Sequence, residues 1–319
     1  MNIRTFAPAD YPAIAGIHNS LGIVWPEAPR TPEGWAQSDR SRNPKYPSRR
    51  WVAETGGQVV GLGAFWQYSL DFHPPWFHVN VEVSPSHQRQ GIGAALYDQV
   101  MAGLQPFDPH ILRADAFANL PQGFRFLQQR GFYEAFRETP VHLDIASFDP
   151  SPYAGLEARL LDKGIVLKSL RELASDPDRD RKTYDLYWQI TEDVPQEETR
   201  IVAPDLHEWV EWGLNDPTIL PDAYYIAVSG GEYVGLSELG KDPDNDVLQC
   251  GLLGVRRPYR RHGIALTLQL RGIAYGQEHG HPVLKTCTAI QNAPMQALFD
   301  KLSFARDPEW QQCQKDMSK

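Results

Sequence analysis

Cysteine is scarce in this sequence, with 3 residues among 319. Cys250, Cys287 and Cys313 form no CxxC motif, and an odd number of thiols cannot pair completely. This pattern is typical of proteins from a reducing compartment, and it predicts buried, unpaired thiols at all three positions.

Long hydrophobic runs are also missing, because no apolar stretch approaches the roughly 18 residues that a membrane-spanning helix needs. The opening segment, MNIRTFAPADYP, lacks the basic residues followed by an apolar core that mark a signal peptide. We therefore expect no membrane association and a cytoplasmic location.

Positive charge is in deficit, since 31 Lys and Arg residues face 40 Asp and Glu residues and give a net charge of −9. Proteins that neutralise phosphates along nucleic acid normally carry the opposite sign, so nucleic acid is not an expected partner. A small anionic cofactor stays compatible with this charge, because backbone dipoles can hold an anion locally. The length and the 42% hydrophobic content are those of a globular protein with two domains.

The sequence repeats itself at a nearly constant spacing. The segment VEVSPSHQRQGIGAALYDQVM matches LLGVRRPYRRHGIALTLQLRG, and Gly91 and Gly263 are 172 residues apart. The endings QQRGF, at 128–132, and DKLSF, at 300–304, keep that spacing. Several landmarks at one spacing predict two copies of one domain.

We place the N-terminal domain at 1–148, a linker at 149–164 and the C-terminal domain at 165–319. The linker region begins with a stretch of prolines and a glycine that interrupts regular structure, and LEARLLDKG within it can add a helical turn or two.

Hydrophobic periodicity predicts the same order of elements in both copies. In the first copy we expect strands at 2–6, 50–54, 58–66, 77–83, 110–117 and 141–145 and helices at 9–21, 91–104 and 122–130. In the second copy we expect strands at 166–171, 224–229, 233–238, 247–255 and 283–289 and helices at 179–191, 263–278 and 293–302. The predicted fold class is α/β, with a mixed sheet covered by helices on both faces in each copy.

A helix that opens with glycine follows one strand in each copy. The first copy reads Gln88, Arg89, Gln90, Gly91, Ile92, Gly93, Ala94, and the second reads Arg260, Arg261, His262, Gly263, Ile264, Ala265. A helix N-terminus leaves backbone N–H groups unpaired and carries about half a positive charge, and glycine lets a pyrophosphate approach them. The arginines can add charge-assisted hydrogen bonds. The alternative is a plain strand-to-helix turn in which glycine serves only geometry.

At these residues the sequence resembles the GNAT N-acyltransferase superfamily, over nearly all of both halves. The second copy also contains IQNAPMQALFDKLSF, which is similar to the Asn-x-x-Met…Leu-Gly-Phe ending of that superfamily. The tandem arrangement is similar to that of enzymes of the mycothiol synthase type.

The resemblance implies that acetyl-CoA, or another acyl-CoA, lies where two adjacent strands splay apart, and that a small amine or amino-acid-like molecule accepts the acyl group. The predicted coenzyme A residues are Val83, Gln88, Arg89, Gln90, Gly91, Ile92, Gly93, Ala94 and Asn119 in the first copy and Val255, Arg260, Arg261, His262, Gly263, Ile264, Ala265 and Asn292 in the second. No metal site is predicted.

The catalytic residues depart from the pattern of the superfamily. Many members carry a tyrosine four residues before the Leu-Gly-Phe glycine, where this sequence has Leu127 and Phe299. The candidate bases are Glu82, at the end of the strand that enters the first cradle, and Glu238, at the end of a strand in the second copy. For both glutamates the alternative is a solvated or capping carboxylate.

Several functions therefore stay open. The first is a working N-acyltransferase whose second copy is active, because the ending of that copy is closer to the pattern. The missing tyrosine also fits a catalytically degenerate acyl-CoA-binding protein or sensor, or a duplicated scaffold. Trp25, Trp35, Trp51, Trp66 and Trp76 of the first copy belong either to its core or to an acceptor pocket. We expect a monomer or a homodimer.

Overall fold

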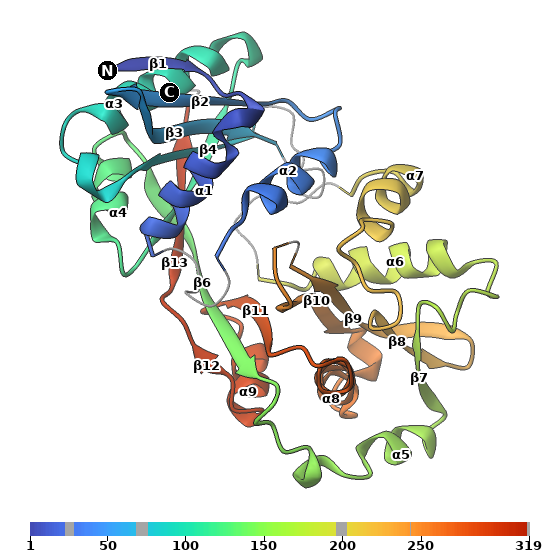
Figure 1. Cartoon of the computed structure of the whole chain (residues 1–319). Helices are drawn as coiled ribbons and strands as arrows, with labels where there is room; N and C mark the ends of the chain where they lie inside the picture. The colour runs from blue at the N-terminus through green and yellow to red at the C-terminus, as the bar shows by residue number, and fades with distance from the viewer. Residues whose placement is uncertain (23–28, 68–75, 196–202, 243, 318–319) are drawn as a thin grey trace. The chain divides into compact units, whose positions relative to one another are not determined.

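The computed structural model describes residues 1–22, 29–67, 76–195, 203–242 and 244–317 (Figure 1). The chain divides into two compact units. Unit 1 comprises the described residues of Met1–Arg137, Glu197–Pro204 and Pro308–Lys319, and unit 2 comprises those of Glu138–Gln196 and Asp205–Asp307.

Unit 1 is a mixed sheet in the order β1-β2-β3-β4-β5-β13-β6. Its elements are β1 (Asn2–Thr5), α1 (Tyr11–Ser20), α2 (Pro32–Arg40), β2 (Ser48–Thr55), β3 (Gln58–Trp66), β4 (Trp76–Val83), α3 (Ile92–Leu104), β5 (Ile111–Phe117), α4 (Pro121–Gln128), β13 (Trp310–Asp316) and the first part of β6 (Tyr133–Asp144). Neighbouring strands are antiparallel from β1 to β4, whereas β4 and β5 are parallel.

Unit 2 repeats this design in the order β6-β11-β10-β9-β8-β7. Its elements are the second part of β6, α5 (Leu156–Leu161), β7 (Ile165–Ser169), α6 (Arg179–Thr191), α7 (Leu206–Trp209), β8 (Tyr225–Ser229), β9 (Glu232–Lys241), β10 (Leu248–Val255), α8 (Ile264–His279), β11 (Val283–Ala289), α9 (Ala293–Lys301) and the short β12 (Ala305–Arg306). Among the described strands of unit 2, β10 and β11 are the parallel neighbours.

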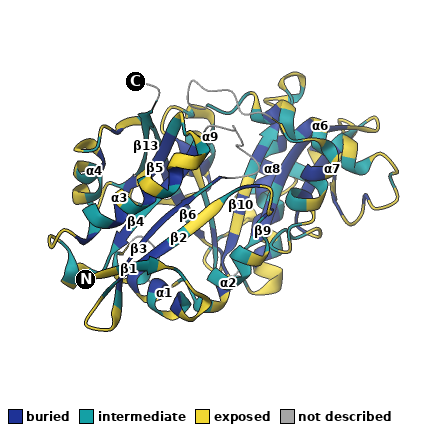
Figure 2. Ribbon diagram, turned by 90° about the horizontal axis from the view of Figure 1, so that it is seen from above, coloured by how far each residue is buried: buried dark blue, intermediate teal, exposed yellow. Residues whose placement is uncertain are grey.

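Helices cover both faces of each sheet, because apolar side chains point from the strands to both faces. In unit 1, Val52 and Leu62 pack against Ile14 of α1, whereas Ala53 packs against Leu96 of α3. Successive side chains of a strand point to opposite faces, so α1 and α3 lie on opposite faces of this sheet. Figure 2 shows dark blue buried residues in the strands, interspersed with teal and yellow ones.

The predicted fold class is confirmed, and most predicted elements are present at the expected places. Among the helices and strands named above for the described residues, α2, α7, β12 and β13 were not predicted from the sequence. The segment 149–164 contains α5, which is the helical turn expected there. The domain limits at 148 and 165 stay a prediction, because the compact units are divided differently.

The compact units differ from the sequence halves because the closing strands are exchanged. Strand β13, from the end of the chain, pairs antiparallel with β5 in unit 1. Residues 138–144 of β6 pair with β11 in unit 2. Figure 1 shows the long green β6 and the red β13 as neighbours, as the strand order requires.

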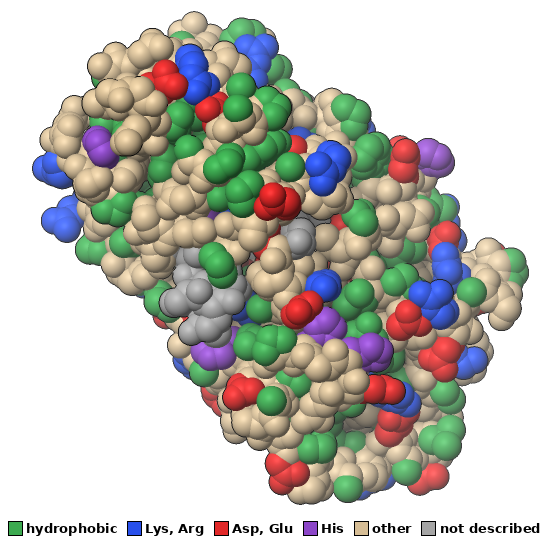
Figure 3. All heavy atoms as spheres, in the orientation of Figure 1, with side chains coloured by type: hydrophobic (Ala, Val, Ile, Leu, Met, Phe, Trp, Pro, Cys, Tyr) green, Lys and Arg blue, Asp and Glu red, His purple; other side chains and the backbone are tan. Residues whose placement is uncertain are grey.

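None of the helices in the described ranges combines the length and the apolar character that a membrane span requires. All three cysteines are free, and Cys250 and Cys313 are buried. Cys287 is exposed, which corrects the expectation of three buried thiols, because its strand β11 leaves its neighbour β10 before this residue. On the face drawn in Figure 3, acidic and basic side chains are interspersed.

Candidate functional sites

Two parallel strands separate in each unit. In unit 1, β4 and β5 pair only from Trp76 with Ile111 to His78 with Arg113, although β4 continues to Val83. In unit 2, β10 and β11 pair only at Leu248 with Leu284 and Gln249 with Lys285. Beyond these points the ladder between each pair of strands ends, so the facing backbone groups are open to a ligand that pairs like an additional strand.

The loop after the separated strand has the same backbone conformation in both units. Arg89 and Gly91 have φ values of 63° and 83°, and Arg261 and Gly263 have values of 66° and 89°. A Cβ placed on either glycine would meet no atom within 4 Å. Neither α3 nor α8 has a side-chain cap at its N-terminus, so their first N–H groups face open space. This is the geometry of an anion-binding cradle.

The first side chain of each motif forms a hydrogen bond to the end of the preceding strand. Gln88 Nε2 donates to the carbonyl of Val83 at 3.0 Å, and Arg260 Nε donates to the carbonyl of Val255 at 2.9 Å. These two residues therefore fix the loop to the end of the strand.

The arginines of the two cradles have different surroundings. Arg89 and Arg261 are exposed. In unit 2, Asp193 accepts hydrogen bonds from both Arg257 and Arg260, and the bond from Arg257 holds the pKa of Asp193 below its ordinary value. The position in unit 1 that corresponds to Arg257 is Pro85, so unit 1 has no such cluster at this point.

The remaining predicted cradle residues contribute mainly backbone. Ile92 and Ile264 have buried side chains that belong to the cores. Gly93, Ala94 and Ala265 are half-buried in the first helical turn, and Gln90 donates to the carbonyl of Ser86 at 3.3 Å. His262 is exposed beside Lys163.

The two predicted asparagines do not occupy equivalent positions. Asn292 is the N-cap of α9, and its side chain accepts from the N–H of Met295 at 3.4 Å. The N-cap of α4 in unit 1 is Leu120, and Asn119 before it is exposed and donates to the carbonyl of Gly22 at 3.4 Å. Helix capping is thus a structural reason for an asparagine at position 292, and it does not apply to Asn119.

Glu238 lies opposite a β-bulge at the point where β10 leaves β11. The register between β9 and β10 shifts between Cys250 and Leu253, and Glu238 faces the extra residue. A Cβ on Gly251 would lie 2.7 Å from the Cδ of Glu238, so only glycine leaves room for this carboxylate. The N–H of Leu252 approaches Glu238 Oε2 at 3.5 Å.

The surroundings of Glu238 favour the protonated form of its carboxyl group up to about pH 7. Burial raises its pKa to about 7, and the carboxylate of Asp216 acts in the same direction. The neighbouring hydroxyls of Tyr187 and Tyr224 have raised pKa values for the same reason, burial first and the charge of Glu238 second. The hydroxyl of Tyr224 is buried without a hydrogen-bond partner in the described chain. These groups form a polar cluster on the face opposite α8.

Glu82 lies on the separated part of β4 and is only 5% exposed. Its Oε1 lies 2.8 Å from Nδ1 of His18 on α1 and 2.9 Å from Nδ2 of Asn80, whereas its Oε2 is buried without a partner among the described residues. Sequence reasoning missed His18, because the contact joins residues 64 positions apart. It also missed Asp193, Tyr187 and Tyr224.

The positions of the missing tyrosine lie inside the cores. Leu127 is 8% exposed in a cluster with Tyr97 and Phe132, and Phe299 is 1% exposed in the core of unit 2. Neither side chain could donate a proton.

The tryptophans of the first copy have different roles. Trp51 is buried in the core of unit 1, whereas Trp35 on α2 packs edge-on against His18 with the ring centroids 5.8 Å apart. Trp25 lies outside the described residues.

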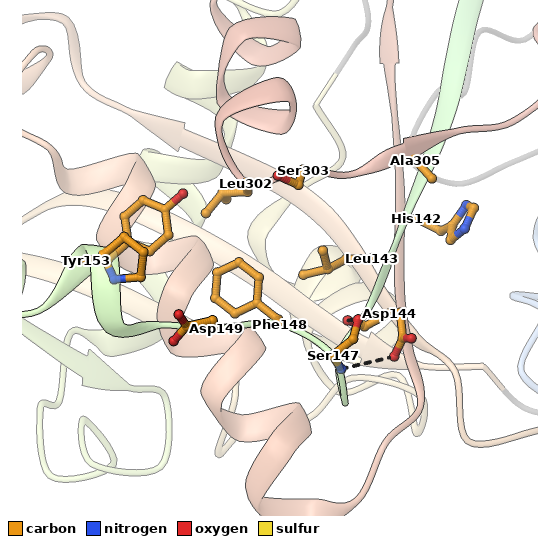
Figure 4. Close-up of a pocket in the computed structure, with 11 residues that line it drawn as sticks. His142, Leu143, Asp144, Ser147, Phe148, Asp149, Tyr153, Leu302, Ser303 and Ala305 are labelled. Carbon is orange, nitrogen blue, oxygen red and sulfur yellow. Dashed lines mark hydrogen bonds between the residues drawn. The ribbon is translucent and has the colours of Figure 1, made fainter.

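A cavity of about 380 Å³ lies elsewhere in unit 2 (Figure 4). It is lined by residues of β6, of 147–153 and of 302–305 after α9, with the rings of Phe148 and Tyr153 stacked 6.0 Å apart. None of the predicted coenzyme A residues lines it, and neither does Glu238. The cavity therefore has no part in the chemistry of the separated strands.

Comparison with known proteins agrees with this geometry. The model of the family described as Acetyltransferase (GNAT) family matches residues 14–132 and 181–304, once in each half. A probable N-acetyltransferase of Mycobacterium tuberculosis, Rv2775, is 25% identical over 167 residues, which are 49% of this chain and 88% of that protein.

Two solved structures resemble the chain over nearly its whole length. A GCN5-related N-acetyltransferase from Sphaerobacter thermophilus has a TM-score of 0.76 at 18% identity and covers 99% of this chain and 95% of its own. A tandem GNAT protein from the clavulanic acid biosynthesis pathway has a TM-score of 0.76 at 20% identity and covers 99% and 98%. At these identities the two structures support the fold.

Proposed function

The chain belongs to the acetyltransferase (GNAT) family, and on that premise we propose that it transfers the acetyl group of acetyl-CoA to a small amine or amino-acid-like acceptor, with unit 2 as the active copy. The observation that carries the proposal is the bulge at Gly251, which gives the carboxylate of Glu238 a place beside the separated strands.

Acyl-CoA would bind across the α8 end of β10. The free N–H groups at the N-terminus of α8 and the exposed Arg261 offer donors to the pyrophosphate. The unpaired edge of β10 offers backbone groups to the pantetheine arm. The same parts exist in unit 1, so we expect two acyl-CoA sites per chain.

The acceptor needs a base because an alkylamine is mostly protonated at neutral pH. With a pKa near 10, about one molecule in 10³ is neutral at pH 7, which costs roughly 4 kcal/mol. Burial raises the pKa of Glu238 to about 7. A base with a pKa near the working pH is partly deprotonated and still accepts a proton readily. Glu238 would take the proton of the amine as nitrogen attacks the thioester carbon.

Coenzyme A leaves as a thiolate. With a thiol pKa of about 8.5, this group departs without a dedicated acid, which fits the apolar residues at Leu127 and Phe299. A backbone N–H at the edge of β10 would stabilise the oxyanion that forms before departure.

The test of unit 2 is Glu238→Gln in the full chain with the cradle of unit 1 blocked by Gly91→Glu. We expect kcat/KM to fall by about 10²-fold for the best amine, because general-base catalysis contributes on that scale, while acetyl-CoA affinity stays unchanged. Glu232→Gln is the matched control, since Glu232 is exposed on the same strand. Release of free thiol measures turnover, and an unaltered rate in Glu238→Gln would reject this base.

A second function is favoured by the two apolar side chains at the usual acid position. An acyl-CoA-binding sensor would bind acetyl-CoA in calorimetry and release no thiol with any amine. The panel of amines that tests Glu238 also separates these functions, because a sensor gives binding without turnover in the unmodified chain.

A further inference from the structure

The contact between α1 and β4 in unit 1 is made by two polar side chains. His18 Nδ1 lies 2.8 Å from Glu82 Oε1, with exposed fractions of 17% for the imidazole and 5% for the carboxylate. Asn80 donates to the same oxygen at 2.9 Å, and the second oxygen has no partner among the described residues. A buried carboxylate with one unsatisfied oxygen is unfavourable for stability, so its presence requires a reason other than packing.

Unit 2 makes the same contact without polar groups. The spacing of 172 residues that relates Gly91 to Gly263 relates Glu82 to Gly254, and Ile190 of α6 lies against Gly254 as His18 of α1 lies against Glu82. A Cβ on Gly254 would lie 2.2 Å from Cγ2 of Ile190, so the isoleucine packs directly onto the strand backbone. The fold is therefore compatible with an apolar contact at this place, and the pair in unit 1 is not needed for the architecture.

The pair lies on the correct side of the sheet to meet a substrate. Val81 and Val83 pack with Ile92 and Leu96 of α3, which is the cradle side. Glu82 lies between these valines and reaches His18 on α1, so it points to the opposite face. This part of β4 lies beyond the last pairing with β5, at His78. A donor bound at the cradle and an acceptor beside His18 would thus meet from opposite faces through the separated strands.

The geometry of the pair suits proton transfer. A carboxylate at Nδ1 fixes the tautomer that carries its proton there, which leaves the lone pair on Nε2. Nε2 of His18 has no hydrogen-bond partner in the described chain. A nucleophile, a base and a group that orients the base form a recurring catalytic arrangement, and two of the three are present here.

We propose that unit 1 is a second acyl-transfer centre, in which Nε2 of His18 is the general base and Glu82 is the positioning residue that orients the imidazole. This proposal rests on the proposed function, since it takes its acyl-CoA from the cradle at Gly91. The amine nitrogen forms a bond to the thioester carbon, the carbon–sulfur bond breaks, and His18 passes the proton of the amine to the departing thiolate. The products are an amide and free coenzyme A.

The neighbouring indole indicates the class of acceptor. Nε1 of Trp35 is buried and has no partner in the described residues, and the Trp35 and His18 rings are 5.8 Å apart. A donor on the ring that packs edge-on against the base would satisfy an oxygen of the acceptor that lies a few bonds from the reacting nitrogen. The centre therefore favours amines that carry a carbonyl or carboxylate oxygen, such as α-amino acids, over plain alkylamines.

The experiment uses the full chain with the cradle of unit 2 blocked by Gly263→Glu. Thiol release is measured with acetyl-CoA and pairs of amines that differ only in a carboxylate. We expect residual turnover that prefers the carboxylate-bearing member at least 10-fold. His18→Ala in this background should lower it at least 100-fold, with the affinity for acetyl-CoA unchanged, and added imidazole should restore part of it. Imidazole should not rescue the double variant His18→Ala, Glu82→Gln, because the orienting carboxylate is gone.

His18→Gln keeps a donor for Glu82 and guards against a folding defect; it should lose the same activity. Residual turnover that His18→Gln leaves intact overturns the proposal. So does a Gly263→Glu chain that still binds one acetyl-CoA and turns over nothing while the unmodified chain is active. If the unmodified chain turns over no amine, the proposed function itself fails, and this inference fails with it.

Discussion

The two units share a cradle and differ in the carboxylate that accompanies it. In unit 1 the acid is Glu82, on the strand that enters the cradle, and it pairs with His18. In unit 2 the acid is Glu238, on the neighbouring strand, and a bulge makes room for it at Gly251. The corresponding ladder between β3 and β4 in unit 1 has no register shift. Duplication has thus preserved the part that would bind a shared cofactor and changed the part that would meet the acceptor.

The largest expected effect tests whether the two cradles are equivalent. A glutamate at Gly91 or at Gly263 puts a carboxylate where pyrophosphate would lie, so acetyl-CoA affinity at that site should fall at least 100-fold, about 2.7 kcal/mol. Calorimetry of each variant should show one site per chain instead of two. The control is Gly280→Glu, at the other end of α8, where φ is 73° and no atom is within 4 Å. An unchanged affinity in either cradle variant would reject that site.

The pH dependence of turnover sharpens the contrast between the two bases. Glu238 acts when it is deprotonated, and burial raises its pKa to about 7. In a Gly91→Glu chain, which keeps only unit 2, kcat/KM should therefore rise about tenfold per pH unit below pH 7 and level off above it. The measurement is a thiol-release profile from pH 5 to 9. A flat profile would contradict the role of Glu238.

Stability should carry the same signature. A carboxyl whose folded pKa is raised stabilises the fold below its ordinary value near 4.5, and this contribution is lost as pH rises through about 7. Glu238→Gln should thus leave stability nearly unchanged at pH 4 and increase it at pH 8 by on the order of 2 kcal/mol. Urea unfolding at both pH values measures this difference, with Glu232→Gln as the control. Equal changes at the two pH values would count against a raised pKa.

The smallest effect concerns the support behind the cradles. Arg260→Gln gives unit 2 the residue that unit 1 uses, and Gln88 makes the same bond to its strand carbonyl as Arg260 does. We expect less than about a threefold change in acetyl-CoA affinity, because the supporting hydrogen bond is kept. A tenfold loss would mean that the guanidinium itself contacts the cofactor.

Much of the fold followed from the sequence because the repeat at 172 residues carries its own landmarks. The cradle could be predicted from Gly91 and Gly263, since a left-handed residue before a helix is a local requirement that glycine meets without strain. The residues on the acceptor side could not be predicted from such a local requirement. The contact between His18 and Glu82 depends on how α1 lies on β4. The bulge at Gly251 leaves no signal in the sequence that distinguishes it from a regular strand. Helix α2 was missed because its residues are mostly polar.

The exchanged closing strands limit how this protein can be made and divided. Strand β13 completes the sheet of unit 1, yet its residues, 310–316, lie far along the chain from its neighbour β5. The sheet of unit 1 is therefore complete only after this distant segment has paired with β5, and non-local pairing of this kind slows folding. A cut within residues 149–164 would leave the N-terminal fragment without β13 and the C-terminal fragment without the part of β6 that pairs with β11, so neither fragment could complete its sheet alone.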